Sequence, residues 1–233
     1  MLEKLILTLI WSDLNKYGAV IFLGKTTTLL ILSSTLTTLI YLAFGEKLPF
    51  DLFIFSYENL KRGYFWSLIT SLFIHANLFH LFGNMLFLYA FGRTMEKEIG
   101  SGKTMLAFFL GGVLSFILSI PFYESNIRMI GSSAAIFTLV SMTMLIKPLK
   151  FSWIFFMPLG LVAIIYFLYN VLAVMYIEAG ATGVSYIGHV IGFTVGLPLG
   201  AAWSKGKWKR NILIAIGLLV AYTFIINVFS IPY

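Results

Sequence analysis

Cysteine is absent from this chain of 233 residues, and only 11% of its residues are charged. Without cysteine, neither a disulfide nor a thiolate metal site can form. A soluble domain carries about 25% charged residues, whereas this chain is 60% hydrophobic. No polar or Pro-rich linker interrupts the apolar segments. These absences predict an all-α polytopic membrane protein, because helices satisfy their own backbone hydrogen bonds in lipid.

Seven apolar stretches are long enough to cross the hydrocarbon core, which takes about 20 helical residues. They lie near residues 27–45, 78–93, 104–123, 131–146, 151–176, 184–203 and 211–230.

The positive net charge of +7 is compatible with nucleic-acid binding, but the positions of the basic residues argue against it. With the N-terminus inside, all of the 16 lysines and arginines except Lys47, Lys61, Arg62 and Arg128 fall on the cytoplasmic side. This bias predicts a plasma-membrane protein with a cytoplasmic N-terminus and an external C-terminus. Membrane lipids are its expected surroundings, and we expect no nucleic-acid partner and no obligate protein partner.

Two segments lie outside the predicted spans. Residues 46–77 form the longest connection and are rich in aromatic side chains, which favour the headgroup region. We expect this loop to lie partly in the outer leaflet as short helical pieces. Residues 1–24 are mixed in character, and both an interfacial helix and a frayed tail fit them.

Three polar clusters interrupt the apolar spans: His80 with Asn84, the run 131–133, and His189. At 1.5 Å per helical residue, all three lie roughly 20–24 Å above the nearest cytoplasmic basic residue. They therefore share one depth below the outer surface. Ionisable groups inside a bilayer are costly, so each cluster is a candidate functional site.

Ser133 and His189 are the candidate nucleophile and base. Ser133 follows Gly131 at a sharp turn into a short span, and His189 could reach it from a neighbouring helix. The alternative is that Ser132 or Ser133 only caps the helix. No carboxylate lies at this depth, so we expect a serine–histidine dyad rather than a triad with aspartate.

His80 and Asn84 are four residues apart and therefore share a helix face. They are candidate hydrogen-bond donors to an oxyanion, together with the backbone N–H groups at the start of the short span. The alternative is a hydrogen-bond network that only joins helices. With three histidines and no cysteine, we expect neither a metal site nor a cofactor.

Glycine patterns suggest close helix packing in two places. Gly192 and Gly196 belong to a repeat of small residues after His189, which lets another backbone approach closely. Gly92 and Gly100 flank Glu96 at the predicted cytoplasmic end of the second span. We interpret Glu96 as structural, with its carboxylate bound to nearby backbone.

Four motifs in this order resemble those of the rhomboid intramembrane serine proteases, over roughly residues 55–203. The first joins His75 and Asn77 to His80, Asn84 and Met85. The others are Gly-x-x-x-Glu-x-x-x-Gly at residues 92–100, Gly-x-Ser at 131–133 and His-x-x-Gly-x-x-x-Gly at 189–196. Each motif alone is weak, but four in the family's order are specific.

The resemblance implies a six-helix rhomboid-like core over residues 25–206, with residues 207–233 as an additional transmembrane helix. It implies Ser133 as nucleophile, His189 as base and acid, and His80, Asn84 and the Ser133 N–H as oxyanion donors. Phe137 is expected to pack on His189, and Trp66 matches the tryptophan of the external loop.

The implied activity is cleavage of single-span membrane proteins within or near the membrane. Two other functions remain as alternatives. A catalytically silent relative would bind and escort membrane proteins with the same fold. A transporter is the third reading, but the chain lacks membrane-embedded carboxylates and an evident repeat of its two halves.

Overall fold

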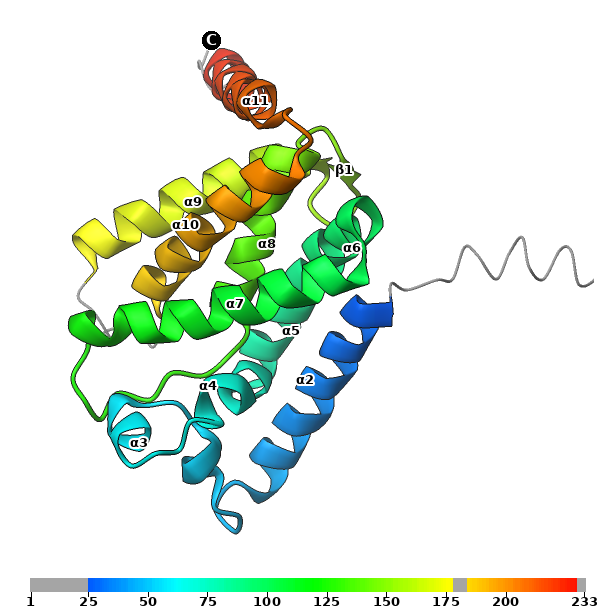
Figure 1. The fold of residues 1–233 in the computed structure, drawn as a ribbon. Coiled ribbons are helices and arrows are strands. Elements are labelled where there is room, and N and C mark those ends of the chain that lie inside the picture. The colour runs from blue at the N-terminus through cyan, green and yellow to red at the C-terminus, as the bar shows by residue number, and fades with distance from the viewer. Residues whose placement is uncertain (1–24, 178–183, 230–233) are drawn as a thin grey trace, which may run out of the picture.

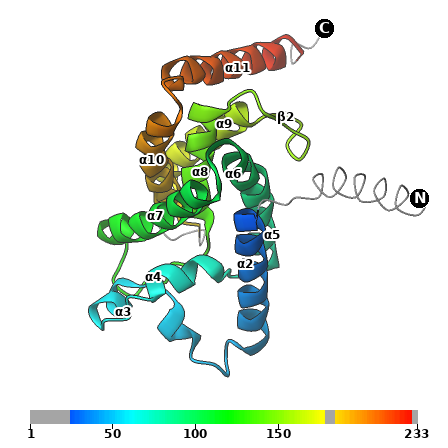
Figure 2. The ribbon, with the colours of Figure 1, turned by 45° about the vertical axis from the view of Figure 1, so that its right-hand side comes forward.

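The computed structural model describes residues 25–177 and 184–229, so the expectations for residues 1–24 lie outside the described residues. Apart from one short hairpin, the regular elements are helices (Figures 1 and 2). The longer elements are α2 (Lys25–Phe44), α5 (Leu78–Phe87), α6 (Arg93–Ile99), α7 (Ser101–Ser119), α8 (Ser133–Ile146), β1 (Phe151–Ser152), β2 (Met157–Pro158), α9 (Leu159–Tyr176), α10 (Tyr186–Trp203) and α11 (Trp208–Phe229).

Each of the seven predicted spans overlaps one of these helices, and the all-α polytopic class is confirmed. Five of the described helices, α2, α7, α9, α10 and α11, are long and apolar enough to cross a membrane. The helices at 67–73 and 78–99 form a further candidate span that is bent by 94°. Helix α8 is apolar but shorter, with 14 residues.

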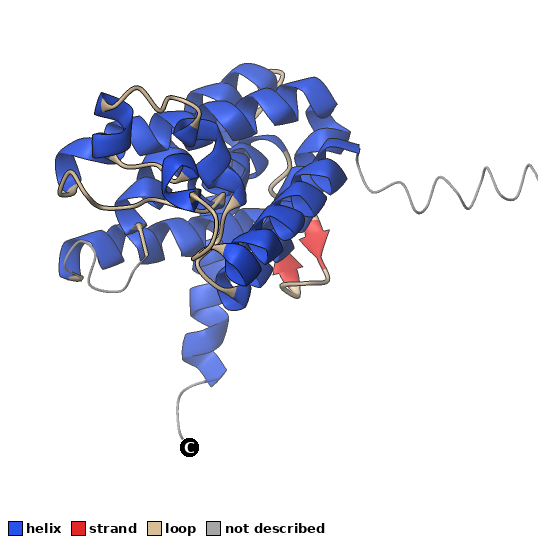
Figure 3. Cartoon of the chain, turned by 90° about the horizontal axis from the view of Figure 1, so that it is seen from below, coloured by secondary structure: helices blue, strands red, loops and turns tan. Residues whose placement is uncertain are grey.

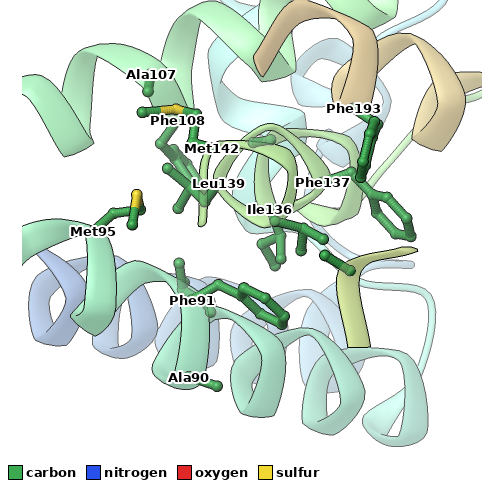
Figure 4. Packing of buried hydrophobic residues seen from close by; sticks show 14 of the residues in the cluster. Ala90, Phe91, Met95, Ala107, Phe108, Ile136, Phe137, Leu139, Met142 and Phe193 are labelled. Carbon is green, nitrogen blue, oxygen red and sulfur yellow. The ribbon is translucent and has the colours of Figure 1, made fainter. Parts of the chain in front are cut away.

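Helix α8 occupies the centre of the bundle. It contacts α5, α6, α7, α9, α10 and α11, and every side chain from Ala134 to Leu145 is buried. Figure 4 shows Ile136 and Leu139 of α8 packed between Phe91 on one side and Phe108 on another. The helix that begins with Ser133 is therefore held by protein along its whole length.

The connection at residues 46–77 contains short helical pieces, as expected. They are Phe50–Phe53, α3 (Tyr57–Lys61), α4 (Ser67–Thr70) and Ser71–Phe73. The Trp66 indole N–H donates to the Leu52 carbonyl at 2.8 Å, so Trp66 joins the later part of this loop to its beginning. An isolated bridge between Phe55 and Met129 ties this loop to the segment that leads into α8.

The second predicted span continues past residue 93. Five residues of π-helix, Leu88–Gly92, join α5 to α6, which ends at Ile99. Gly100 has φ +86°, a conformation that side chains with a Cβ rarely adopt, and it separates α6 from α7.

Glu96 is structural, but its backbone partners come from the distant N-terminus of α2. Its carboxylate accepts hydrogen bonds from the Thr26 and Thr27 backbone N–H groups at 2.9 and 3.0 Å. The hydroxyls of Thr27 and Ser101 also donate to it. Gly92 lies against Thr27, which lets α2 approach this point. The carboxylate thus satisfies N–H groups that have no partner within α2.

The predicted start of the fifth span, residue 151, is too early. Residues 151–158 form an antiparallel hairpin in which Phe151 pairs with Pro158, and helix α9 starts only at Leu159. The hairpin is as apolar as a helix, so hydropathy alone did not separate the two. Pro158 is extended, with φ −62° and ψ 138°, and it lies directly before the first helical residue.

Helices α8 and α10 approach closely along the glycine repeat, as predicted. A Cβ at Gly192 would lie 2.1 Å from the Ala134 carbonyl oxygen, and one at Gly196 would lie 2.0 Å from Ser141 Oγ. The Thr138 hydroxyl donates to the Gly192 carbonyl at 2.8 Å across the same contact. This seam sets the distance between Ser133 and His189.

Helix α11 leaves the bundle near its own start (Figures 2 and 3). Only Asn211 and Ala215 are buried on it. The Asn211 amide donates to the Leu145 carbonyl at 2.7 Å, at the end of α8. This C-terminal helix is therefore joined to the core at its base.

Candidate active site

Ser133 and His189 contact each other directly. Ser133 Oγ lies 2.8 Å from His189 Nε2, across the seam between α8 and α10. Ser132 occupies the position before the helix, but its side chain makes no capping hydrogen bond. Its hydroxyl lies instead 3.3 Å from His75 Nε2. The capping alternative therefore fails for both serines, and the Ser133 hydroxyl is directed at an imidazole.

Phe137, one turn after Ser133, stacks on the imidazole of His189. The ring centroids are 4.5 Å apart and the planes differ by 6°. This packing is the one that the resemblance implied. It restricts rotation of the imidazole and keeps Nε2 facing the serine.

Asn170 is a site residue that the sequence analysis missed. It lies on α9 and is buried, with its Oδ1 2.7 Å from His189 Nδ1. Its Nδ2 donates to the Tyr166 carbonyl at 2.7 Å. The available signal was an amide alone in the apolar helix Leu159–Tyr176, where a buried polar group needs a partner.

His80 and Asn84 face the same space as Ser133. Gly131 has φ +102°, and a Cβ there would lie 2.8 Å from His80 Cε1, so the turn before Ser133 packs against that ring. The Asn84 Nδ2 is buried without a hydrogen-bond partner. A buried donor left free is costly, and a free donor beside a serine can serve an oxyanion.

His75 supports the turn from behind. It is fully buried, with Nδ1 3.0 Å from Thr38 Oγ1 and Nε2 facing Ser132. Its ring lies edge-on to that of His80, with centroids 5.0 Å apart. His75 therefore links α2 to the turn that carries the serine.

A cavity of about 700 Å³ opens over these groups. Its lining includes Ser133, His189, His80 and Asn84, with apolar walls from Phe87 and Phe137. A hydroxyl, an imidazole and free donors around one cavity can carry out acyl transfer. Among the residues that the structure describes, no three histidine or carboxylate side chains come together to share a metal ion.

Comparison with known proteins matches this arrangement to one family. The model of the Rhomboid domain matches residues 62–206, which is more than half of the chain. The chain belongs to the rhomboid family. The matched region contains all of the candidate site residues, from Trp66 to Gly196, and ends before α11.

Several curated rhomboid relatives are similar in sequence. The chain is 26% identical over 168 residues to "Rhomboid-like protease 1" of Toxoplasma gondii, covering 70% of this chain and 57% of that protein. It is 28% identical over 187 residues to "Rhomboid protease GluP" of Bacillus subtilis, covering 77% of this chain and 34% of that protein. The chain therefore spans a little more than half of the length of the first relative and about a third of the second.

Similarity also extends to a relative that is named inactive. The chain is 36% identical over 75 residues to "Inactive RHOMBOID-like protein 8" of Arabidopsis thaliana, covering 32% of this chain and 21% of that protein. Family membership alone therefore supports an integral membrane protein of protease type. Whether this member cleaves depends on its own site.

Proposed function

We propose that this rhomboid is an intramembrane serine endopeptidase that uses Ser133 and His189 as its catalytic dyad. The observation that carries the proposal is the 2.8 Å contact between Ser133 Oγ and His189 Nε2 beside a cavity. That distance allows the imidazole to accept the hydroxyl proton directly.

The reaction would proceed as acyl transfer. His189 Nε2 takes the Ser133 proton while Oγ attacks the scissile carbonyl carbon. His80, the free Nδ2 of Asn84 and the Ser133 backbone N–H stabilise the oxyanion. His189 then gives the proton to the leaving amine, and water hydrolyses the acyl-enzyme through the same steps.

The proposed substrates are single-span membrane proteins. A helical peptide bond hides its carbonyl in an internal hydrogen bond, so the segment must unwind near the site of cleavage. Small or helix-breaking residues there should favour cleavage. The proposal requires no metal and no cofactor, since the hydroxyl and imidazole supply the chemistry.

A serine-reactive fluorophosphonate probe and a panel of single-span substrates test this function. We expect the detergent-purified protein to be labelled and to cleave at least one substrate. Ser133→Ala should abolish both, and His189→Ala should reduce both by several orders of magnitude. Ser141→Ala is the matched control, because Ser141 lies on the same helix and donates only to the Thr138 carbonyl.

The main rival is a silent relative that binds membrane proteins without cutting them. Its motivation is the similarity to a protein that is named inactive. If Ser133→Ala is labelled as strongly as the native protein, the nucleophile is misassigned. Substrate capture without cleavage by the native protein would favour the rival.

A further inference from the structure

The hydrogen bonds of Asn170 determine how its amide is oriented. Its Nδ2 donates to the Tyr166 carbonyl, which accepts but cannot donate. The other end of the amide, Oδ1, therefore faces His189 Nδ1 at 2.7 Å. An amide oxygen only accepts, so the hydrogen between these two atoms must belong to Nδ1.

This orientation selects one tautomer of the neutral imidazole. With the hydrogen on Nδ1, the lone pair of Nε2 is free to accept the proton of Ser133 Oγ at 2.8 Å. The opposite tautomer would place two lone pairs against each other at Nδ1 and Oδ1. Three helices contribute to this chain of groups, since Asn170, His189 and Ser133 lie on α9, α10 and α8.

We infer that Asn170 is a positioning residue that holds His189 in the tautomer and orientation needed to deprotonate Ser133. The site is thus a Ser133–His189–Asn170 arrangement rather than a dyad alone. A similar cysteine–histidine–asparagine order occurs in soluble proteases of unrelated fold. This inference rests on the proposed function, because it assigns a role within that same site.

Burial explains why an amide suits this position. Asn170 is 2% exposed, and an ionised carboxylate there would need to be desolvated. An amide orients the imidazole without that cost. The competing explanation is that Asn170 only joins α9 to α10, as polar side chains do in membrane bundles. Such a packing role would lower stability on substitution without changing kcat in the folded protein.

Asn170→Leu replaces the amide with an apolar side chain of similar size, so both hydrogen bonds of the amide are lost. We expect kcat to fall by roughly 10- to 100-fold, the loss typical when a partner that orients a metal-bound histidine is removed, with little change in KM. Leu172→Ala is the control on the same helix, since Leu172 is exposed. A native kcat for Asn170→Leu would overturn the inference.

Nitrogen NMR of histidine-labelled native protein reads the tautomer directly. The three histidines of the chain keep the spectrum simple. We expect the His189 hydrogen on Nδ1 in the native protein, and a mixture of tautomers in Asn170→Leu. A native His189 with its hydrogen on Nε2, or no change on substitution, would show that Asn170 only packs.

Asn170→Asp keeps an acceptor opposite Nδ1, and the Tyr166 carbonyl keeps its helical hydrogen bond. We expect at least tenfold more activity than in Asn170→Leu. A carboxylate stabilises an imidazolium, so the acidic limb of the rate profile should move to higher pH. His80 and Tyr186 lie near the ring, and Tyr123, Arg128 and Tyr166 line the same cavity. All five are unchanged in both variants. Activity as low as in Asn170→Leu would contradict a positioning role.

The two proposals fail in different ways. If Ser133→Ala loses labelling while Asn170→Leu keeps native rates, only the role of Asn170 is wrong. If the native protein neither cleaves nor reacts with the probe, the proposed function is wrong, and the tautomer found by NMR still decides what Asn170 does.

Discussion

Two adjacent hydroxyls at the start of α8 have different surroundings. The Ser132 side chain faces His75 and is fully buried, whereas the Ser133 side chain faces His189 and the cavity. The positive φ of Gly131 sets this difference, because it turns the chain sharply before the helix. One residue of register therefore separates a structural hydroxyl from a candidate nucleophile.

Asn84 allows a test of the oxyanion site without touching the nucleophile. Asn84→Ala removes the buried Nδ2 that has no partner, and we expect kcat to fall by about 10²–10³. Probe labelling should persist, because Ser133 and His189 keep their contact. Time courses of substrate cleavage and of labelling measure the two effects. Equal loss of both, together with a lower thermal unfolding temperature, would indicate a structural role for Asn84.

Single residues show which contacts of the site could be predicted from the sequence. The contact between Ser133 and His189 was expected because each belongs to a short motif on one helix, and the stacking of Phe137 was expected from the resemblance to the rhomboid family. Their catalytic roles stay a prediction. Asn170 was missed because its role depends on which helix α9 packs against, and hydropathy does not contain that information. The hydrogen bonds of Glu96 to backbone were predicted, but the sequence did not identify their donors, because Thr26 and Thr27 are about 70 residues away.

At the scale of elements, the seam between α8 and α10 has almost no free space. Gly196→Ala would place a methyl group 2.0 Å from Ser141 Oγ and 2.3 Å from the Thr138 carbonyl oxygen. We expect unfolding free energy to fall by about 1–3 kcal/mol and cleavage to fall with it, because the helices must separate. Thermal unfolding in detergent measures the change.

Gly217→Ala is the matched control for that seam. Nothing lies within 4 Å of a Cβ at Gly217 on α11, so this change should leave stability and cleavage nearly as they are. A Gly196→Ala variant as stable as Gly217→Ala would contradict the close contact between α8 and α10.

Helix ends were harder to predict than helices. The apolar run from residue 151 gave no sign of the hairpin, because its aromatic residues suit a strand or an interface as well as a helix. The continuation of the second span to Ile99 was missed because charged residues do not stop a helix. The helix ends instead at Gly100, whose backbone has a positive φ.

At the scale of the whole molecule, ion pairs join distant chain segments that the charge bias places on the same side. Lys147 pairs with Glu98 at 3.1 Å on the predicted cytoplasmic side, and Arg128 pairs with Asp51 at 2.9 Å on the predicted external side. The arrangement agrees with the predicted topology, while the side that faces the cytoplasm remains a prediction.

The lack of cysteine makes that orientation simple to test. Glu46→Cys and Lys207→Cys each introduce one thiol at an exposed position, on opposite predicted sides. We expect a membrane-impermeant maleimide to label Glu46→Cys in intact cells and Lys207→Cys only after permeabilisation. The native protein gives the background. The reverse pattern would invert the topology.

The burial of α8 separates the nucleophile from the lipid. Because protein surrounds this helix, a thicker or thinner bilayer must act first on the outer helices, which can tilt, while Ser133 keeps its height in the bundle. The scissile bond of a bound substrate would then be chosen by its distance from a fixed point in the enzyme, and the same bond would be cut in membranes of different composition.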